Sequence, residues 1–247
     1  MSIQFNHNKI NCQYLVTIAL SRDLDERLSR NHPIFELADW WNINHEMKKK
    51  EQTQRKMEER FWQACFEGKV EEVKRLLNQN SHFNINWQNH SELSITPFYV
   101  ACREGHTITV KLLLNDSRVD FNQANMYGST PFWSACYNGR DGMVKLLLSD
   151  KRVHVNKANN YGTTPFMSAC QCGHIKVVKY LLESSFEREI DIKKKDNEGK
   201  TGLDWARQNG KRDVVELIQK RIENEKRNNK IVTRGIFFFF FFFFFFF

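Results

Sequence analysis

A short segment of the chain holds three potential metal ligands within five residues: Cys170, Cys172 and His174. Thiolates and imidazoles bind Zn²⁺, but a structural zinc site needs four ligands in tetrahedral geometry, so a fourth residue would have to join these three. Cys170 and Cys172 stand two residues apart, and side chains at that spacing on a helix point in different directions. The sequence contains no Ser-His-Asp grouping, no phosphate-binding glycine loop and no pair of carboxylates at catalytic spacing. We therefore predict no catalytic residues, no metal site and no cofactor.

The cysteines follow a pattern that requires neither metal nor disulfide chemistry. Cys102, Cys136 and Cys170 stand 34 residues apart, and Cys65 precedes Cys102 by 37 residues. Cysteines that recur at one position of a repeated unit are explained as small buried apolar side chains. The apolar run Tyr14–Leu20 is too short, and too weakly preceded by positive charge, for a secretory signal sequence. We therefore expect a reducing, cytoplasmic location.

The repeated unit is marked by the phrase Thr-Pro-Phe, which occurs three times at a spacing of 34 residues. The copies start at Thr96, Thr130 and Thr164. Each is followed at fixed offsets by Ala-Cys, by a glycine and by a run of the form Val-Lys-x-Leu-Leu. Less regular copies flank these three, the first around Ala64-Cys65 and the last around Thr201-Gly202. A fixed period of this length is typical of a stacked solenoid, in which each unit buries its apolar face against its neighbours.

Each part of the repeated phrase predicts a structural element. Threonine is a good helix N-cap and proline suits the first helical position, so Thr-Pro predicts the start of a first helix. The glycine ends that helix because it tolerates a positive φ. The Val-Lys-x-Leu-Leu run supplies the apolar stripe of a second helix, and the small Ala-Cys pair lets neighbouring helices approach closely. Between units, Asn125-x-x-Gly128 and Asn159-x-x-Gly162 predict tight turns at the tips of short hairpins.

These residues resemble the signature of the ankyrin repeat, in which Asp-x-x-Gly-x-Thr-Pro-Leu-His-x-Ala precedes Val-x-x-Leu-Leu. The resemblance implies an all-α repeat solenoid of about five stacked helix-loop-helix units joined by short β-hairpin loops. The expected units are 58–90, 91–124, 125–158, 159–195 and 196–228. Outside them we expect an N-terminal segment without a recognised motif (1–46), a basic helical lead-in (47–57) and a basic, then poly-Phe tail that does not fold (229–247).

The sequence departs from the ankyrin signature at three kinds of position. The usual histidine after Pro-Leu is replaced by Tyr99, Trp133 and Met167, so the hydrogen bonds of that histidine are expected to be missing. Ser94 stands where a loop-tip glycine would be, and no Thr-Pro opens the first unit. We expect local distortion at both of these places.

Three other residues are assigned structural roles by the resemblance. His106 and His174 keep the family's Gly-His position, where packing and hydrogen bonding are the expected roles. Trp133 replaces a residue that the family directs inward, so packing is its preferred interpretation.

Seven of the eight excess charges in the net charge of +8 lie in two flanks, 47–60 and 220–234. Residues 47–60 sum to +3 and residues 220–247 to +4, whereas residues 61–219 sum to +3 and residues 1–46 to −2. A groove for nucleic acid would need this positive charge on the concave face of the solenoid. Solvated helical flanks are therefore the preferred interpretation, and nucleic acid is not the expected partner.

The two ends of the sequence leave alternatives open. Eleven consecutive phenylalanines, Phe237–Phe247, follow Ile236. As a helix these twelve apolar residues would span about 18 Å, short of the ~30 Å hydrocarbon core of a membrane. We interpret the tract as a homopolymer artefact of the gene model, with a membrane-surface anchor as the alternative. For residues 1–46, both a helix around Trp40-Trp41 that covers the first unit and a disordered or wrongly extended start stay open.

Binding is the function that remains. Ankyrin-like solenoids present loop tips and first helices on a concave face, where the fold does not fix the side chains. The candidate partner-binding residues are Met126, Tyr127, Ser129, Tyr137 and Asn138 in the third unit, and Asn160, Tyr161, Thr163, Gln171 and Cys172 in the fourth. Tyrosines anchor many protein interfaces, although packing along the hairpins explains Tyr127 and Tyr161 equally well. We predict a non-enzymatic adaptor or regulatory module that binds another protein. The alternatives are an electrostatic binder of nucleic acid or anionic membrane, and a structural spacer or fragment of a longer repeat protein.

Overall fold

The computed structural model describes residues 34–79, 83–184 and 187–227. The chain divides into two compact parts, an N-terminal part (Met1–Gln54) and a C-terminal part (Arg55–Phe247). In the N-terminal part the described residues are helical, and the Trp41 side chain there is 62% exposed. The predictions for residues 1–33 and for the poly-Phe tail lie outside the described residues. Within those that are described, no helix is both long enough and apolar enough to cross a membrane.

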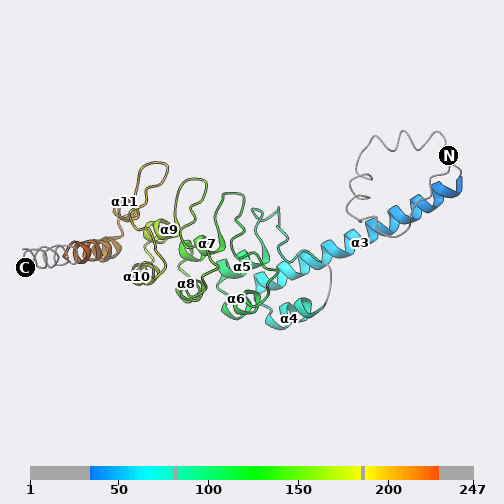
Figure 1. Ribbon diagram of the computed structural model, residues 1–247, viewed down its shortest axis with the longest axis horizontal. Coiled ribbons are helices and arrows are strands. Elements are labelled where there is room, and N and C mark those ends of the chain that lie inside the picture. The colour runs from blue at the N-terminus through cyan, green and yellow to red at the C-terminus, as the bar shows by residue number, and fades with distance from the viewer. Residues whose placement is uncertain (1–33, 80–82, 185–186, 228–247) are drawn as a thin grey trace, which may run out of the picture. The chain divides into compact units, whose positions relative to one another are not determined.

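Successive helix pairs build the described residues of the C-terminal part (Figure 1). The helices are α3 (Ile34–Glu67), α4 (Val70–Asn78), α5 (Pro97–Glu104), α6 (Thr107–Leu114), α7 (Pro131–Tyr137), α8 (Asp141–Leu148), α9 (Pro165–Cys172), α10 (Ile175–Glu183) and α11 (Gly202–Gln208), with residues 212–227 also helical. In each of the pairs α5–α6, α7–α8 and α9–α10, the first helix lies between a projecting loop and the second helix (Figure 1). The predicted all-helical repeat fold is confirmed.

The predicted start signals act as helix caps. The hydroxyls of Thr96, Thr130 and Thr164 accept hydrogen bonds from the backbone N–H three residues later, at 3.1, 3.1 and 3.2 Å. A proline occupies the first turn of each of these helices, where its missing N–H leaves no bond unmade. Gly105 and Gly173 end α5 and α9 with φ of 89° and 82°, as the glycine of the phrase predicts.

The core is a continuous stack of apolar side chains contributed by every helix pair. The phenylalanines of the repeated phrase, Phe98, Phe132 and Phe166, are at most 2% exposed. Ala135 and Ala169 are 0% exposed on α7 and α9, which pack against each other. Because each pair covers its neighbour, the middle units lose the most apolar surface to packing.

Tight turns close the connections between units, as predicted. In the loop before α7, the Asn125 N–H donates to the Ser129 carbonyl at 3.0 Å, and the Gly128 N–H donates to the Asn125 carbonyl at 2.9 Å. Gly128 has a φ of +74°, which suits a residue without a Cβ. The described loops form no strand, and the one isolated bridge among them joins Asn89 to Ile95. The hairpins are therefore turns closed by a few hydrogen bonds, without an extended ladder.

The predicted local distortion occurs at Ser94, whereas the helix of the first repeat is regular. Leu93 and Ser94 each have a φ of 57°, a left-handed conformation that costs a residue with a Cβ about 1–2 kcal/mol. The loop is held by hydrogen bonds from the Ser94 N–H to the Asn89 carbonyl at 2.9 Å and from the Asn89 N–H to the Ile95 carbonyl at 3.0 Å. In the first repeat, where Thr-Pro is missing, no cap interrupts α3, which continues from Ile34 to Glu67.

The close helix contact at Ala135 leads to a stability prediction. Ala135→Leu is expected to lower the free energy of unfolding by about 1–3 kcal/mol, because the added carbons have no space to occupy. The matched control is Gly142→Ala in α8, where an added methyl group would meet nothing within 4 Å. That change is expected to raise the free energy of unfolding by about 0.5–1 kcal/mol, since alanine restricts the unfolded chain. Urea unfolding followed by circular dichroism measures both, and equal effects would contradict tight packing at Ala135.

Candidate partner-binding face

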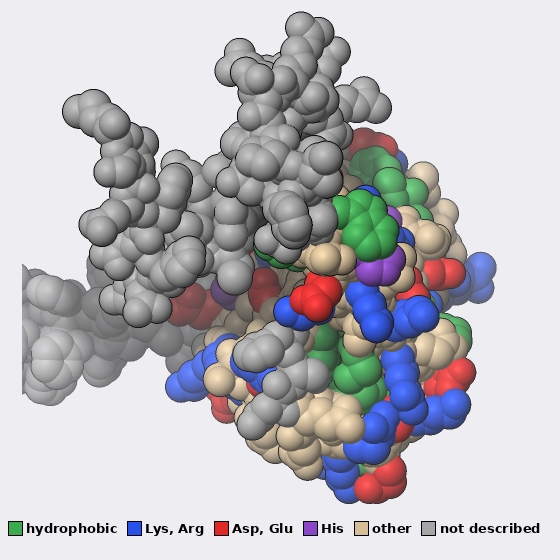
Figure 2. Space-filling view, turned by 90° about the vertical axis from the view of Figure 1, so that its right-hand side faces the viewer, with side chains coloured by type: hydrophobic (Ala, Val, Ile, Leu, Met, Phe, Trp, Pro, Cys, Tyr) green, Lys and Arg blue, Asp and Glu red, His purple; other side chains and the backbone are tan. Residues whose placement is uncertain are grey.

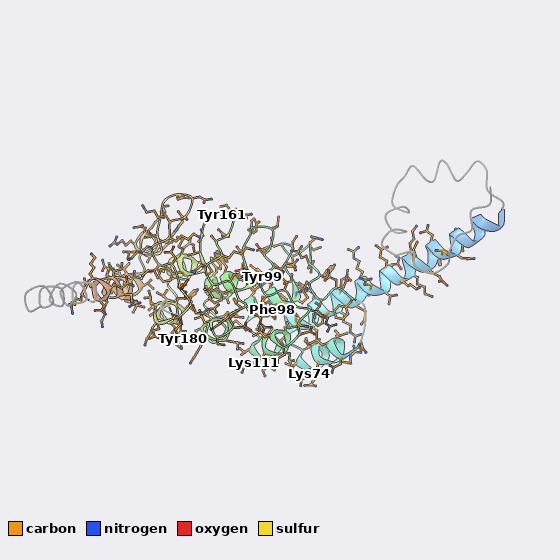
Figure 3. The ribbon with its side chains drawn as sticks, viewed as in Figure 1. Lys74, Phe98, Tyr99, Lys111, Tyr161 and Tyr180 are labelled. Atoms are coloured by element: carbon orange, nitrogen blue, oxygen red, sulfur yellow. The ribbon has the colours of Figure 1, made fainter. Side chains whose placement is uncertain are left out.

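Large apolar side chains are exposed at the tips of successive loops. Leu93, Tyr127 and Tyr161 occupy the same position of three consecutive loops and are 42%, 41% and 62% exposed. Met126, next to Tyr127, is 58% exposed. These exposed side chains follow one another along the loops, on the side of the molecule where Figure 3 places Tyr161.

The backbones of these tips are hydrogen-bonded from one unit to the next. The Met126 N–H donates to the Leu93 carbonyl at 3.1 Å, and the Asn160 N–H donates to the Tyr127 carbonyl at 3.0 Å. The Asn197 N–H then donates to the Tyr161 carbonyl at 3.2 Å. The exposed side chains therefore extend from a connected backbone, which lowers the entropy lost when a partner binds.

An aromatic pair continues this surface from the loop base along the first helix. The Trp133 Nε1–H donates to the Thr163 carbonyl at 3.0 Å, at the base of the next loop. The Trp133 ring stacks on Tyr137, with centroids 5.1 Å apart and planes inclined by 12°. Tyr137 is 44% exposed, whereas Trp133 is partly buried. Trp133 thus packs into the fold and also makes a bond to the next unit that sequence reasoning did not anticipate.

The first unit repeats this arrangement. The Trp62 Nε1–H donates to the Ile95 carbonyl at 3.1 Å, and its ring stacks on Phe66 with centroids 5.6 Å apart. Phe66 is 37% exposed. In the second unit the Tyr99 hydroxyl takes the place of the indole and accepts a hydrogen bond from the Asn125 side chain at 3.2 Å. The hydrogen bonds expected to disappear with the family's histidine are therefore replaced by other bonds between units.

The structure exposes most of the predicted site residues. Met126, Tyr127, Tyr137, Asn138, Asn160 and Tyr161 are exposed, and Gln171 and Cys172 are partly exposed. We call these eight residues the tyrosine face. Ser129 and Thr163 are not part of it, since they are only 3% and 8% exposed at the ends of the loops, next to the first helices. Phe66 and Leu93 were missed, although they share the repeat positions of Tyr137 and Tyr127.

Charged side chains are absent from the segments that carry the tyrosine face. Residues 121–139 and 158–175 contain no Asp, Glu, Lys or Arg. Lys74 and Lys111 lie with the second helices, on the opposite side from Tyr161 (Figure 3). On the face drawn in Figure 2, basic and acidic side chains are interspersed. Over units three and four, the described loop tips and first helices are therefore uncharged, whereas the charged side is that of the second helices, which carry Lys145, Lys176 and Lys179.

A shallow cavity of about 500 Å³ lies on that charged side, between α6 and α8. Its lining includes Lys111, Lys151 and Arg152. Arg152 is already engaged, since it pairs with Asp150 at 2.6 Å and donates to the Leu114 carbonyl at 2.8 Å. The Asp150 carboxylate thus neutralises part of the positive charge that lines the cavity.

The histidines at the Gly-His position bond neighbouring units together. The His106 Nε2–H donates to the Phe66 carbonyl at 2.8 Å, and the His174 Nε2–H donates to the Tyr137 carbonyl at 2.8 Å. In each bond, the histidine follows the first helix of its own unit, and the carbonyl belongs to the last turn of the first helix in the preceding unit. The expected hydrogen-bonding role of both histidines is confirmed.

The repeated cysteines are buried thiols. Cys65, Cys102, Cys136 and Cys170 are 0% exposed and form no disulfide. Burial raises the pKa of the Cys102 and Cys136 thiols well above the usual range, because a thiolate would be desolvated there. Among the described residues, no group of three or more His, Cys, Asp and Glu side chains lies close enough to hold a metal ion.

The thiols give a second prediction. In the folded chain Cys172 is expected to react with a soluble thiol reagent, whereas Cys102 and Cys136 should react only after unfolding in urea. Mass spectrometry of labelled peptides measures this difference. Rapid labelling of Cys136 in the folded chain would contradict the tight stack.

The buried thiols also predict how stability depends on pH. Because the pKa of Cys102 is raised in the folded state, the free energy of unfolding is retained below the usual thiol pKa near 9 and falls as the pH rises above it. Urea melts between about pH 7 and 10 measure this effect.

Comparison with known proteins agrees with this geometry. A family model described as ankyrin repeats (3 copies) matches residues 61–159 and 151–228. No curated protein matches the chain.

Proposed function

The chain belongs to the ankyrin repeat family, whose repeats are generally protein–protein interaction modules, and we propose that it is a non-enzymatic adaptor or regulatory module. It binds another protein through the tyrosine face and needs no cofactor. A cytoplasmic location fits the buried, unpaired cysteines of the repeats, because a reducing compartment keeps thiols from oxidising.

One observation carries the proposal: four large side chains of the tyrosine face are 41–62% exposed on a hydrogen-bonded backbone. They are Met126, Tyr127, Tyr137 and Tyr161. Tyrosine presents a large apolar area with only two rotatable bonds, so it loses little side-chain entropy when a partner covers it. Interface cores are enriched in such residues and depleted of charge, and this face has both properties.

Affinity capture with the full chain tests the proposal. The variant Tyr127→Ser/Tyr161→Ser is expected to lose the specific partner, because aromatic anchors each contribute on the order of 2 kcal/mol or more to binding. The matched control is Ile108→Ser/Ile175→Ser, which removes two side chains that are 63% and 43% exposed on α6 and α10. Capture that survives the tyrosine changes and disappears with the isoleucine changes would reject the tyrosine face as the site.

Electrostatic binding of a polyanion is the competing function, supported by the basic residues at 47–60 and 220–227. Salt separates the two proposals. Binding that depends on these residues should weaken steeply between about 50 and 200 mM salt, because it releases counterions. Binding through the uncharged tyrosine face should change little over the same range.

A further inference from the structure

From the chemistry of the tyrosine face, we infer that its ligand is an uncharged, extended polypeptide segment with apolar or aromatic side chains. This inference rests on the proposed function and specifies the class of partner. It depends on three features: the missing charge, the polar groups left without partners, and the charges at either end.

Because the tyrosine face lacks charged residues, charged side chains of the ligand are unfavourable at the centre of the contact. Within units three and four, the loop tip and first helix carry no ionisable carboxylate, ammonium or guanidinium group over residues 121–139 and 158–175. A charged partner residue covered by this surface would lose its hydration without gaining a counter-ion. An uncharged side chain suffers no such cost, so neutral sequences are favoured.

The polar groups on the face match a polypeptide backbone. The hydroxyls of Tyr127, Tyr137 and Tyr161 and the side-chain amide of Gln171 make no hydrogen bond within the described part of the chain. Phenols and primary amides can both donate and accept. An extended segment brings N–H and C=O groups that are not used internally, whereas a helix has already paired those in its interior. The extended form is therefore the one that satisfies these groups when water leaves.

Charged residues mark both ends of the neutral surface. In the second unit, Arg103 and Glu104 stand at the repeat positions of Tyr137 and Asn138 and pair with each other at 2.7 Å. Beyond the fourth unit, Glu198 takes the repeat position of Tyr161 and pairs with Lys200 at 2.6 Å. At the same end, Lys211 of the fifth unit adds a positive charge beside Cys172. The neutral contact thus covers unit three and the loop tip of unit four, and charges on a ligand are tolerated only outside this span.

Selection of peptides on the full chain tests the inference. A displayed library of random peptides is selected on the wild-type protein, and enriched peptides are synthesised for measurement of Kd. We expect uncharged peptides whose Kd changes less than about twofold between 50 and 200 mM salt. Tyr137→Lys should weaken them by at least about tenfold, since it removes an anchor and adds an unpaired charge. Ile108→Lys, an equally drastic change on α6, should leave their Kd unaltered.

The outcomes separate the inference from the proposed function. Enriched peptides that require Tyr137 but carry charges, and that weaken steeply with salt, would overturn the inference and leave the binding face standing. Peptides that bind the Tyr137→Lys and Tyr127→Ser/Tyr161→Ser proteins as tightly as the wild type would overturn both. Circular dichroism first verifies that each variant is folded. If Tyr137→Lys is not, Gln171→Lys places the charge on the neighbouring unit and carries the same expectations.

Discussion

Phe132→Ala is expected to lower the free energy of unfolding by about 3–5 kcal/mol, enough to unfold many arrays of this size. Phe132 is 0% exposed in the middle of the stack, on a helix that packs against α5, α8 and α9. Removing its ring leaves a cavity that helices held from both sides cannot close. Because each unit is stabilised by its neighbours, a damaged middle unit also uncouples the two halves of the array.

Urea unfolding followed by circular dichroism measures this effect. Tyr137→Ala is the matched control, since it removes an aromatic ring from the same helix at a position that is 44% exposed. We expect the control to cost less than about 1 kcal/mol. Similar losses from the two changes would mean that the core does not depend on the repeated phenylalanines.

The repeated phrase predicts the fold well because its signals act locally. Thr130 needs only the N–H of Trp133 to cap a helix, and the turn at Asn125 and Gly128 is closed within five residues. Such interactions depend on neighbours in sequence, so a pattern in the sequence is enough to place them. The absence of charge in residues 121–139 was equally visible in the sequence, although its significance depends on knowing which positions are exposed.

The sequence could not predict the contacts between units. The bond from Trp133 to the Thr163 carbonyl joins residues 30 positions apart, and its equivalent in the first unit joins Trp62 to Ile95. Ser129 illustrates a related limit, because a small polar residue beside an exposed loop tip is 3% exposed once its loop closes through hydrogen bonds to Asn125. The sequence therefore predicted exposure correctly for the large side chains of the candidate face, but not for Ser129 and Thr163.

Ending the chain at Lys195 is expected to make the remaining array aggregate or lose cooperative unfolding. Helix α11 packs against α9 so closely that a Cβ at Gly202 would lie 2.7 Å from the Phe166 ring. Residues 212–227 add a second helix that buries Val214 and Ile218 inward and presents mostly polar side chains outward. Without these two helices the apolar stripe of α10 would face water, and solenoids need a polar terminal unit for solubility.

The control for this truncation is a chain that ends at Arg227, which keeps the described residues of both helices and removes residues 228–247. We expect that chain to unfold at the same urea concentration as the full chain, because the interactions that bury Phe166 lie before residue 228. Light scattering and urea melts compare the two truncations. A chain ending at Lys195 that stays monomeric and unfolds like the Arg227 chain would show that the last helix pair does not cap the array. In that case the solubility of the fourth unit would have to come from its own second helix, where Lys176 and Lys179 are exposed beside the buried Val177 and Val178.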